Sequence, residues 1–223
     1  AGKHERWVAE ALGPGAAVQP AHLQCLRGGL ASAWRLPWRG QRKEVLWRAC
    51  LNNLLNPELM HREATAAGAP PPPFARCPCG GAGSALPGRR HIFWGCAAAR
   101  AVRAALQTQL TAELTPLQLL VGEAPAGVHA GVWAAVRLAA FNALWRAREF
   151  YRRAMEPGEA EQPVNAPDVT ERGRHMAVQY FWADLEEFVE EQPPPPRWRR
   201  QVGAAHPFIF LQHPAAQLGV RRT

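Results

Sequence analysis

Aspartate is one of the residue types that this sequence most nearly lacks. The 223-residue chain has two aspartates, Asp168 and Asp184, and they lie in no turn of paired carboxylates. Polymerases and most nucleases hold two catalytic metal ions with clustered carboxylates, so the composition excludes that chemistry. Glutamates do gather within residues 186–191. A charged face of this kind on a predicted helix is typical of a solvated surface.

Other signatures of an active site are also missing. The serines lie in no nucleophile elbow, and the isolated histidines His22, His129 and His175 have no evident catalytic partners in the sequence. The glycine-rich stretch at residues 80–83 lacks the Lys-Ser/Thr pair of a phosphate-binding loop. We therefore predict that this chain is not an enzyme and has no small-molecule substrate.

Long hydrophobic runs are absent as well. The most apolar stretch, Val128–Trp145, is interrupted by Arg137, and residues 1–18 contain no apolar core of a signal peptide. The five cysteines are odd in number and clustered, which argues against a secreted disulfide framework. These features predict an intracellular protein, nuclear or cytoplasmic, that is neither secreted nor bound to a membrane.

Lysine is scarce too, but arginine is abundant. Lys3 and Lys43 are the only lysines among 26 basic residues, and the formal net charge is +8 with a pI near 10.1. Such a charge favours binding to polyanions, including nucleic acid. GC-rich codons offer a second explanation, because they produce Ala, Gly, Pro and Arg whatever the function, so the charge alone leaves both readings open.

Proline runs divide the chain, and apolar periodicity predicts a mostly α fold: a small helical zinc-binding module followed by long helices and a basic tail. We expect N-terminal helices in 1–69, a zinc-knuckle-like module with its following helix in 74–112, a helical hairpin in 127–191 and a Pro/Arg-rich tail in 192–223. The expected helices are 20–33, 41–55, 57–60, 97–111, 127–155 and 168–191. An apolar run at 207–211 predicts a short strand or an anchor.

Three of the five cysteines gather in one loop with a histidine. The pattern is Cys77-x-Cys79, eleven residues, then His91-x4-Cys96. Zinc prefers four thiolate or imidazole ligands in a tetrahedron, and the glycines between the two pairs let the backbone curl around an ion. We predict a Zn²⁺ site of these four residues, structural because protein ligands fill every position. Pro78 shortens the first pair, so Cys77 has three alternatives: His61, Cys50 or Cys25. The alternative is that these are buried or incidental thiols, but Cys77 and Cys79 lie in a Pro/Gly loop rather than on an apolar helix face.

The segment "LWRACLNNLLNPELMHREA…CPCG…RRHIFWGCAAARAV" resembles the zinc-binding region downstream of the polymerase in non-LTR retrotransposon reverse transcriptases. The resemblance covers about residues 34–106 and follows the family's order: a Trp-containing helix, a short helix, a Cys pair, a His-x4-Cys pair and a helix. It implies the same four metal ligands, with Trp47 and Leu54 in the helix core, and a parent protein that is an RNA-directed DNA polymerase. The shortened Cys pair and Ala97, where the family often has proline, depart from the pattern.

Arginine and tryptophan alternate in residues 34–48 and again near residue 198. Arginine grips phosphates in a bidentate manner, and tryptophan stacks on unpaired bases. The predicted nucleic-acid-binding residues are Arg35, Arg39, Arg42, Lys43, Arg48, Arg89, Arg90, Arg197, Arg199 and Arg200. The alternative is that Trp34 and Trp47 belong to the core and the arginines form a solubilising surface.

Two hypotheses follow. The first is a non-catalytic zinc module, derived from a retroelement reverse transcriptase, that holds an RNA template or target DNA. The second is a zinc-stabilised protein-interaction domain or an inactive retroelement relic, in which zinc maintains the fold alone. Salt-dependent binding to nucleic acid separates the two.

Overall fold

The computed structural model describes residues 2–51, 53–54, 57–69, 77–79, 88–110, 112–154 and 166–191. Within these ranges the chain is mostly helical and contains no strand, which confirms the mostly α prediction. The α-helices are α1 (Lys3–Leu12), α2 (Pro20–Trp34), α3 (Gly40–Cys50), α4 (Pro57–Ala66), α5 (Ala97–Gln107), α6 (Ala130–Ala154) and α7 (Ala166–Glu191). Two short π-helical segments are η1 (His91–Gly95) and η2 (Leu117–Val121).

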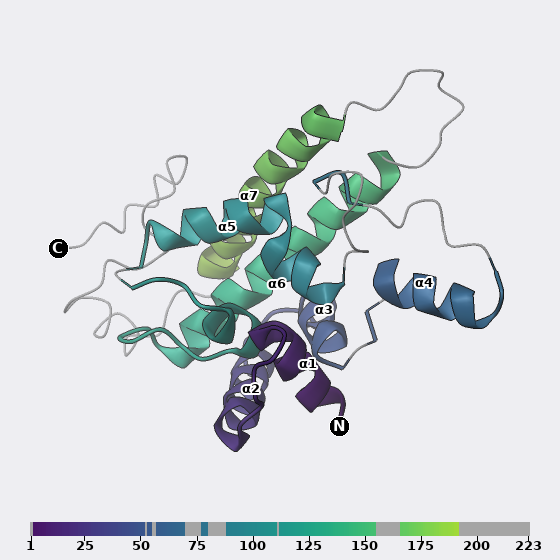
Figure 1. Ribbon diagram of the computed structural model, residues 1–223. Coiled ribbons are helices and arrows are strands. Elements are labelled where there is room, and N and C mark those ends of the chain that lie inside the picture. Colours follow the sequence, from purple (N-terminus) through teal and green to yellow (C-terminus); the bar gives the residue numbers. More distant parts are fainter. Residues whose placement is uncertain are drawn as a thin grey trace.

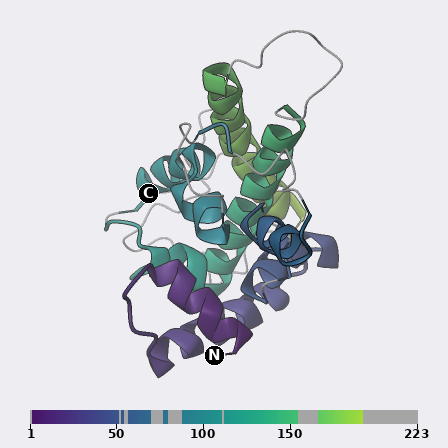
Figure 2. The same ribbon diagram turned by 45° about the vertical axis from the view of Figure 1, so that its right-hand side comes forward.

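Helix α6 is the axis of the molecule. Helix α7 runs back along it in the opposite direction, α5 packs across α7, and α2 and α3 pack against α6 (Figure 1). The view in Figure 2 shows the same layering, with α1 to α3 gathered at one end of α6. Helix α4 stands apart from the other helices in Figure 1. Helices from the expected segments 1–69, 74–112 and 127–191 therefore share one hydrophobic cluster.

Alanine makes α6 suitable as a central helix. It is rich in alanine, which has the highest helix propensity and whose short side chain lets neighbouring helices approach closely. Val132, Val136, Ala139 and Ala140 are buried, whereas Val128 and Trp145 are half-buried. Among the described residues, no helix is both long and apolar enough to cross a bilayer.

The aromatic centre of the core joins three elements. Phe93 of η1 stacks on Phe141 of α6, with ring centroids 4.4 Å apart. Trp7 of α1 meets the same Phe141 ring edge-on at 6.2 Å. Phe93 and Trp7 are fully buried, so Phe93 is a core residue.

Helix boundaries follow the predictions in part. Helix α2 ends one residue after the expected position, but α3 ends at Cys50 rather than at 55, and α4 continues to Ala66 rather than 60. Helix α7 begins two residues before Asp168, and α1 was not anticipated as a separate helix. The apolar run at 207–211 and the tail 192–223 lie outside the described residues.

Arg137 is fully buried in α6 and makes no ion pair among the described residues. Its Nε donates to the carbonyl of Leu119 at 2.8 Å, and its Nη2 donates to that of Leu120 at 3.0 Å. These carbonyls lie at the end of η2, where backbone oxygens carry partial negative charge. Burial lowers the pKa of Arg137 to about 10, although it stays well above neutrality. Gly29 of α2 lies so close to Arg137 that a Cβ added at Gly29 would lie 2.7 Å from Arg137 Nη1.

Candidate metal centre

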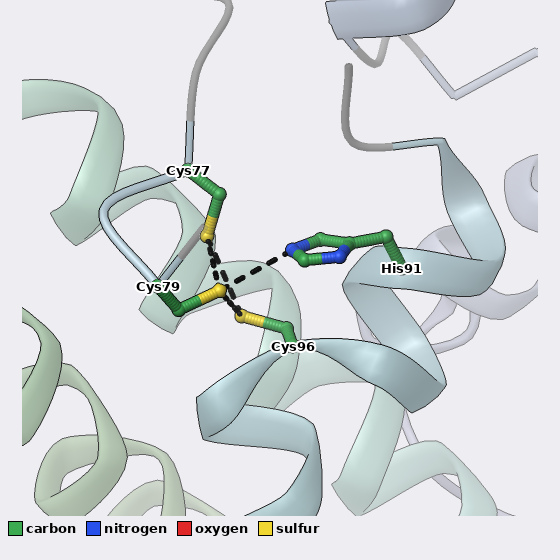
Figure 3. A group of neighbouring side chains, drawn as sticks. All are labelled: Cys77, Cys79, His91 and Cys96. Carbon is green, nitrogen blue, oxygen red and sulfur yellow. Dashed lines mark hydrogen bonds between the residues drawn. The ribbon is translucent and has the colours of Figure 1, made fainter. Parts of the chain in front are cut away.

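Cys77, Cys79, His91 and Cys96 converge on one point, as Figure 3 shows. The two cysteines of the loop 77–79 face His91 from η1 and Cys96 at the start of α5. Their ligand atoms all lie within 4.8 Å of one another. The structure therefore forms a Cys₃His cluster that can bind a metal ion.

Three distances in the cluster match the edges of a tetrahedral site. Metal–sulfur bonds of about 2.3 Å place two sulfurs about 3.8 Å apart, and a sulfur and an imidazole nitrogen somewhat closer. The Sγ of Cys96 lies 3.6 Å from the Sγ of both Cys77 and Cys79, and Cys79 Sγ lies 3.4 Å from His91 Nε2. The Cys77–Cys79 edge is shorter, 3.0 Å, as a pair separated by one proline would be. All three sulfurs belong to free cysteines.

The π-helical turn η1 explains why His and Cys at a five-residue separation can share an ion. An α-helix would turn them about 140° apart. In η1 the Cys96 backbone N–H instead donates to the His91 carbonyl at 2.6 Å, which is an i→i+5 bond. The wider turn brings the two side chains to the same side of the segment, as Figure 3 shows.

The N-terminus of α5 favours negative charge on the sulfurs. Hydrogen bonds from the Cys77 and Cys96 thiols, and one from the Ala97 backbone N–H, hold the pKa of Cys79 well below its usual range. The hydrogen bonds of the Cys77 thiol with Cys79 and Cys96 raise the pKa of Cys77. Burial disfavours protonation of His91, but the neighbouring Cys79 and Cys96 outweigh it and raise the pKa of His91 to about 9. A cation in the cluster would take the place of these shared protons.

The core holds the cluster in place. Phe93, between two of the ligands, stacks on α6, and Cys96 is itself buried. Trp94 is half-buried, with the Arg103 guanidinium carbon 3.9 Å from its ring centroid. Helix α6 also reaches the site through Tyr151, whose pKa is raised by burial and by the cluster's sulfurs. The Tyr151 hydroxyl donates to the Thr170 carbonyl of α7 at 3.0 Å. No sequence pattern pointed to Tyr151.

The alternative ligands do not join the cluster. Among the described residues, the group of candidate ligands consists of the four predicted residues. Cys50 is fully buried in α3, where burial raises the pKa of its thiol to about 12. Cys25 is half-buried in α2, and His61 belongs to the separate helix α4.

Two predicted nucleic-acid-binding cations are internal, which corrects the prediction for both. Arg89 is 4% exposed, ion-pairs with Glu10 of α1 and donates through Nη1 to the Ala49 carbonyl of α3 at 2.6 Å. Lys43 is 9% exposed, and its Nζ donates to the Trp34 carbonyl at 2.9 Å near the end of α2. Both cations therefore satisfy backbone carbonyls at helix C-termini, where positive charge is favourable.

Other predicted cations are accessible to different degrees. Arg42 ion-pairs with Glu187 of α7 and lies 3.8 Å from Asp184, which Arg146 of α6 also contacts. Arg48 is exposed and pairs with Glu44 one helical turn away.

Three further predicted cations lie at or near the surface. Arg35 and Arg39 are exposed, and no carboxylate among the described residues pairs with them. Arg90 is half-buried; its Nε donates to the Ala11 carbonyl at 3.4 Å. The predicted residues Arg197, Arg199 and Arg200 lie outside the described ranges.

The tryptophans of residues 34–48 are divided between core and surface, which contradicts the alternative that Trp34 and Trp47 belong to the core. Trp38 is buried, 3% exposed, whereas Trp34 is 58% and Trp47 is 40% exposed. Trp47 therefore lies at the surface rather than in the helix core that the resemblance implied. The sequence also gave no reason to single out Arg103 of α5, which lies over the Trp94 ring.

Comparison with known proteins yields no relative: no family model, no curated protein and no solved structure matches the chain. The resemblance to the retrotransposon zinc-binding region therefore stays a prediction. Function is inferred below from the residues and their geometry.

Proposed function

We propose that this chain is a non-catalytic zinc module that binds RNA or DNA, and that it derives from the region downstream of a retroelement polymerase. Three thiols and one imidazole are ligands typical of zinc, and four protein ligands leave no open position for a reactant. The ion's role is therefore structural. Thiolate ligands persist in a reducing compartment, which favours a nuclear or cytoplasmic location.

Convergence of the four ligands from separated positions carries the zinc part of the proposal. Seventeen residues separate Cys79 from Cys96, yet their sulfurs lie 3.6 Å apart beside the imidazole of His91. Incidental thiols would have no reason to meet a histidine at tetrahedral spacing. Binding would also add folding free energy, on the order of 10 kcal/mol in small zinc modules, to the junction of η1 and α5.

Surface charge supports the nucleic-acid part. Residues 2–51 carry eight Lys and Arg side chains and three carboxylates, all glutamates. Arg27, Arg35 and Arg39 are exposed there without an ion pair among the described residues. Such an excess on α1 to α3 attracts a polyanion and makes its binding fall as salt rises.

Elemental analysis of the purified chain tests the zinc. We expect one Zn²⁺ per chain, lost in Cys96→Ser and retained in the matched control Cys25→Ser, because Cys25 lies outside the cluster. Equal metal content in the two variants would refute the site.

Salt-dependent binding tests the nucleic-acid part. With zinc-loaded chain and a labelled oligonucleotide, the affinity is expected to fall steeply with salt. The double variant Arg35→Ala with Arg39→Ala should reduce the slope of log K against log salt by about 1.4 to 1.8. Stoichiometric zinc without any salt-dependent binding would refute this part and leave the zinc intact.

A protein-interaction domain stabilised by zinc, or an inactive relic, is the second candidate. The observation in its favour is that Arg89, Lys43 and Arg42 engage groups of the chain itself. Exposed tryptophans are also typical of protein interfaces. Stoichiometric zinc without any salt-dependent binding to the oligonucleotide would favour this candidate.

A further inference from the structure

Trp34 and Trp47 form the wall of an open groove. Among the described residues they are the exposed large hydrophobic side chains, and their ring centroids lie 5.6 Å apart. The groove has a volume of about 350 Å³, within the range of small-ligand pockets. Its lining residues are His4, Arg27, Leu30, Ala31, Trp34 and Trp47.

The two rings lie near the C-terminal ends of two helices that Lys43 links. Trp34 is the last residue of α2, and Trp47 lies in the last turn of α3. Lys43 ties the two helices together: its Nζ donates to the Trp34 carbonyl and lies 5.5 Å from the Trp34 ring centroid. The rings are thus held at the surface in a defined place, ready to contact a flat partner.

One exposed arginine lines this apolar wall, and a second follows Trp34 in the chain. Arg27 lines the groove and is exposed, and Arg35 directly follows Trp34. No carboxylate among the described residues pairs with either guanidinium. An occupant of the groove must therefore offer both an apolar face and negative charge.

We propose that the Trp34–Trp47 groove binds an unpaired base of single-stranded nucleic acid by stacking, while Arg27 and Arg35 contact the adjoining phosphates. The inference rests on the proposed function and narrows it to single strands. A single strand meets both demands at once, because each nucleotide has a flat aromatic face and one negative charge. In a duplex the neighbouring pairs cover those faces, so the rings would have nothing to stack on.

The experiment compares affinities of the full, zinc-loaded chain by fluorescence anisotropy. The probes are a labelled thymidine oligonucleotide of about twelve nucleotides and a duplex of the same length. We expect the variant Trp34→Ala with Trp47→Ala to bind the single strand about tenfold or more weakly, and the duplex within about twofold of the wild type. The slope against salt should not change, because stacking releases no counterions.

Two control variants sharpen the comparison. Trp34→Phe with Trp47→Phe keeps an aromatic face and is expected to restore most of the single-strand affinity. Gln24→Ala changes another exposed position of α2 and should leave it unchanged. If the alanine pair fails to fold, acrylamide quenching of indole fluorescence decides the question with the wild type and the phenylalanine pair. The oligonucleotide must protect the wild-type indoles from acrylamide, and this protection must be lost in the phenylalanine pair. Absence of protection overturns the inference.

The outcomes separate this inference from the proposed function. No binding to either probe by the zinc-loaded wild type refutes both. Salt-dependent binding that the alanine pair leaves within about twofold refutes the stacking groove alone. An equal loss for duplex and single strand also overturns it. Displacement of the oligonucleotide from the groove by polyglutamate, with the same dependence on Trp34 and Trp47, overturns it in favour of an acidic peptide.

Discussion

Methionine in place of Arg137 removes the buried guanidinium and keeps most of the apolar stem. The Leu119 carbonyl accepts from Arg137 Nε at 2.8 Å and would lose that donor. The Leu120 carbonyl would keep the indole N–H of Trp7, which donates at 3.2 Å. One buried acceptor left without a partner costs about 1–3 kcal/mol. The variant also relieves Nη1, a buried donor without a hydrogen-bond partner, so we expect a loss near the lower end of that range.

Lysine at the same position separates charge from hydrogen-bond geometry. Its single nitrogen cannot reproduce the fork that reaches both Leu119 and Leu120, yet it keeps a charge in a fully buried site. We therefore expect Arg137→Lys to be less stable than Arg137→Met at neutral pH. Burial lowers the pKa of a lysine, so the unfolded chain binds more protons than the folded one below about pH 10.4. Stability of Arg137→Lys should therefore rise with pH, by up to about 1.4 kcal/mol per unit.

Urea denaturation followed by circular dichroism measures both effects at a fixed concentration of zinc. The useful window is about pH 6 to pH 8.5, below the titration of ordinary thiols and of Arg137 itself. An Arg137→Met variant at least as stable as the wild type would refute the stabilising role of the hydrogen bonds from Arg137 to the Leu119 and Leu120 carbonyls. So would a lysine variant that matches arginine at every pH, because one nitrogen would then serve as well as two.

Further predictions concern packing and a buried thiol. Gly28→Ala should raise the unfolding free energy by about 0.5–1 kcal/mol, because the position is helical and nothing lies within 4 Å of the new methyl. Gly29→Ala should lower it by about 1–3 kcal/mol, because the methyl would lie 2.7 Å from Arg137 Nη1; urea denaturation of the pair checks the opposite signs. Burial raises the pKa of Cys50 from 9.0 to about 12, so the unfolded chain loses its proton first and stability should fall as pH rises above about 9. Cys50→Ala should flatten that decline and Cys25→Ala should not; identical pH profiles would contradict the assignment.

Local patterns in the sequence determined much of the architecture and of the metal centre. Apolar spacing predicted the long helices, and α6 lies within three residues of its expected start and one of its expected end. The His91-x4-Cys96 spacing indicated two ligands on one turn, and the Cys77–Cys79 pair indicated the other two. The helices and each ligand pair depend on residues close in the chain, so local patterns are sufficient for them, whereas the approach of one pair to the other depends on the fold.

Only the tertiary structure decided which charged and aromatic side chains are buried. Arg89 contacts a carbonyl 40 residues away, Trp7 one 113 residues away, and Arg137 the end of η2. Trp38 is buried, whereas Trp34 and Trp47 are exposed, although all three lie in one Arg-rich stretch. Periodicity tells which residues share a helix face, but the elements that cover that face come from distant parts of the chain. An arginine that satisfies a buried carbonyl and one that stays exposed at the surface are therefore identical in sequence and differ only in what folds against them.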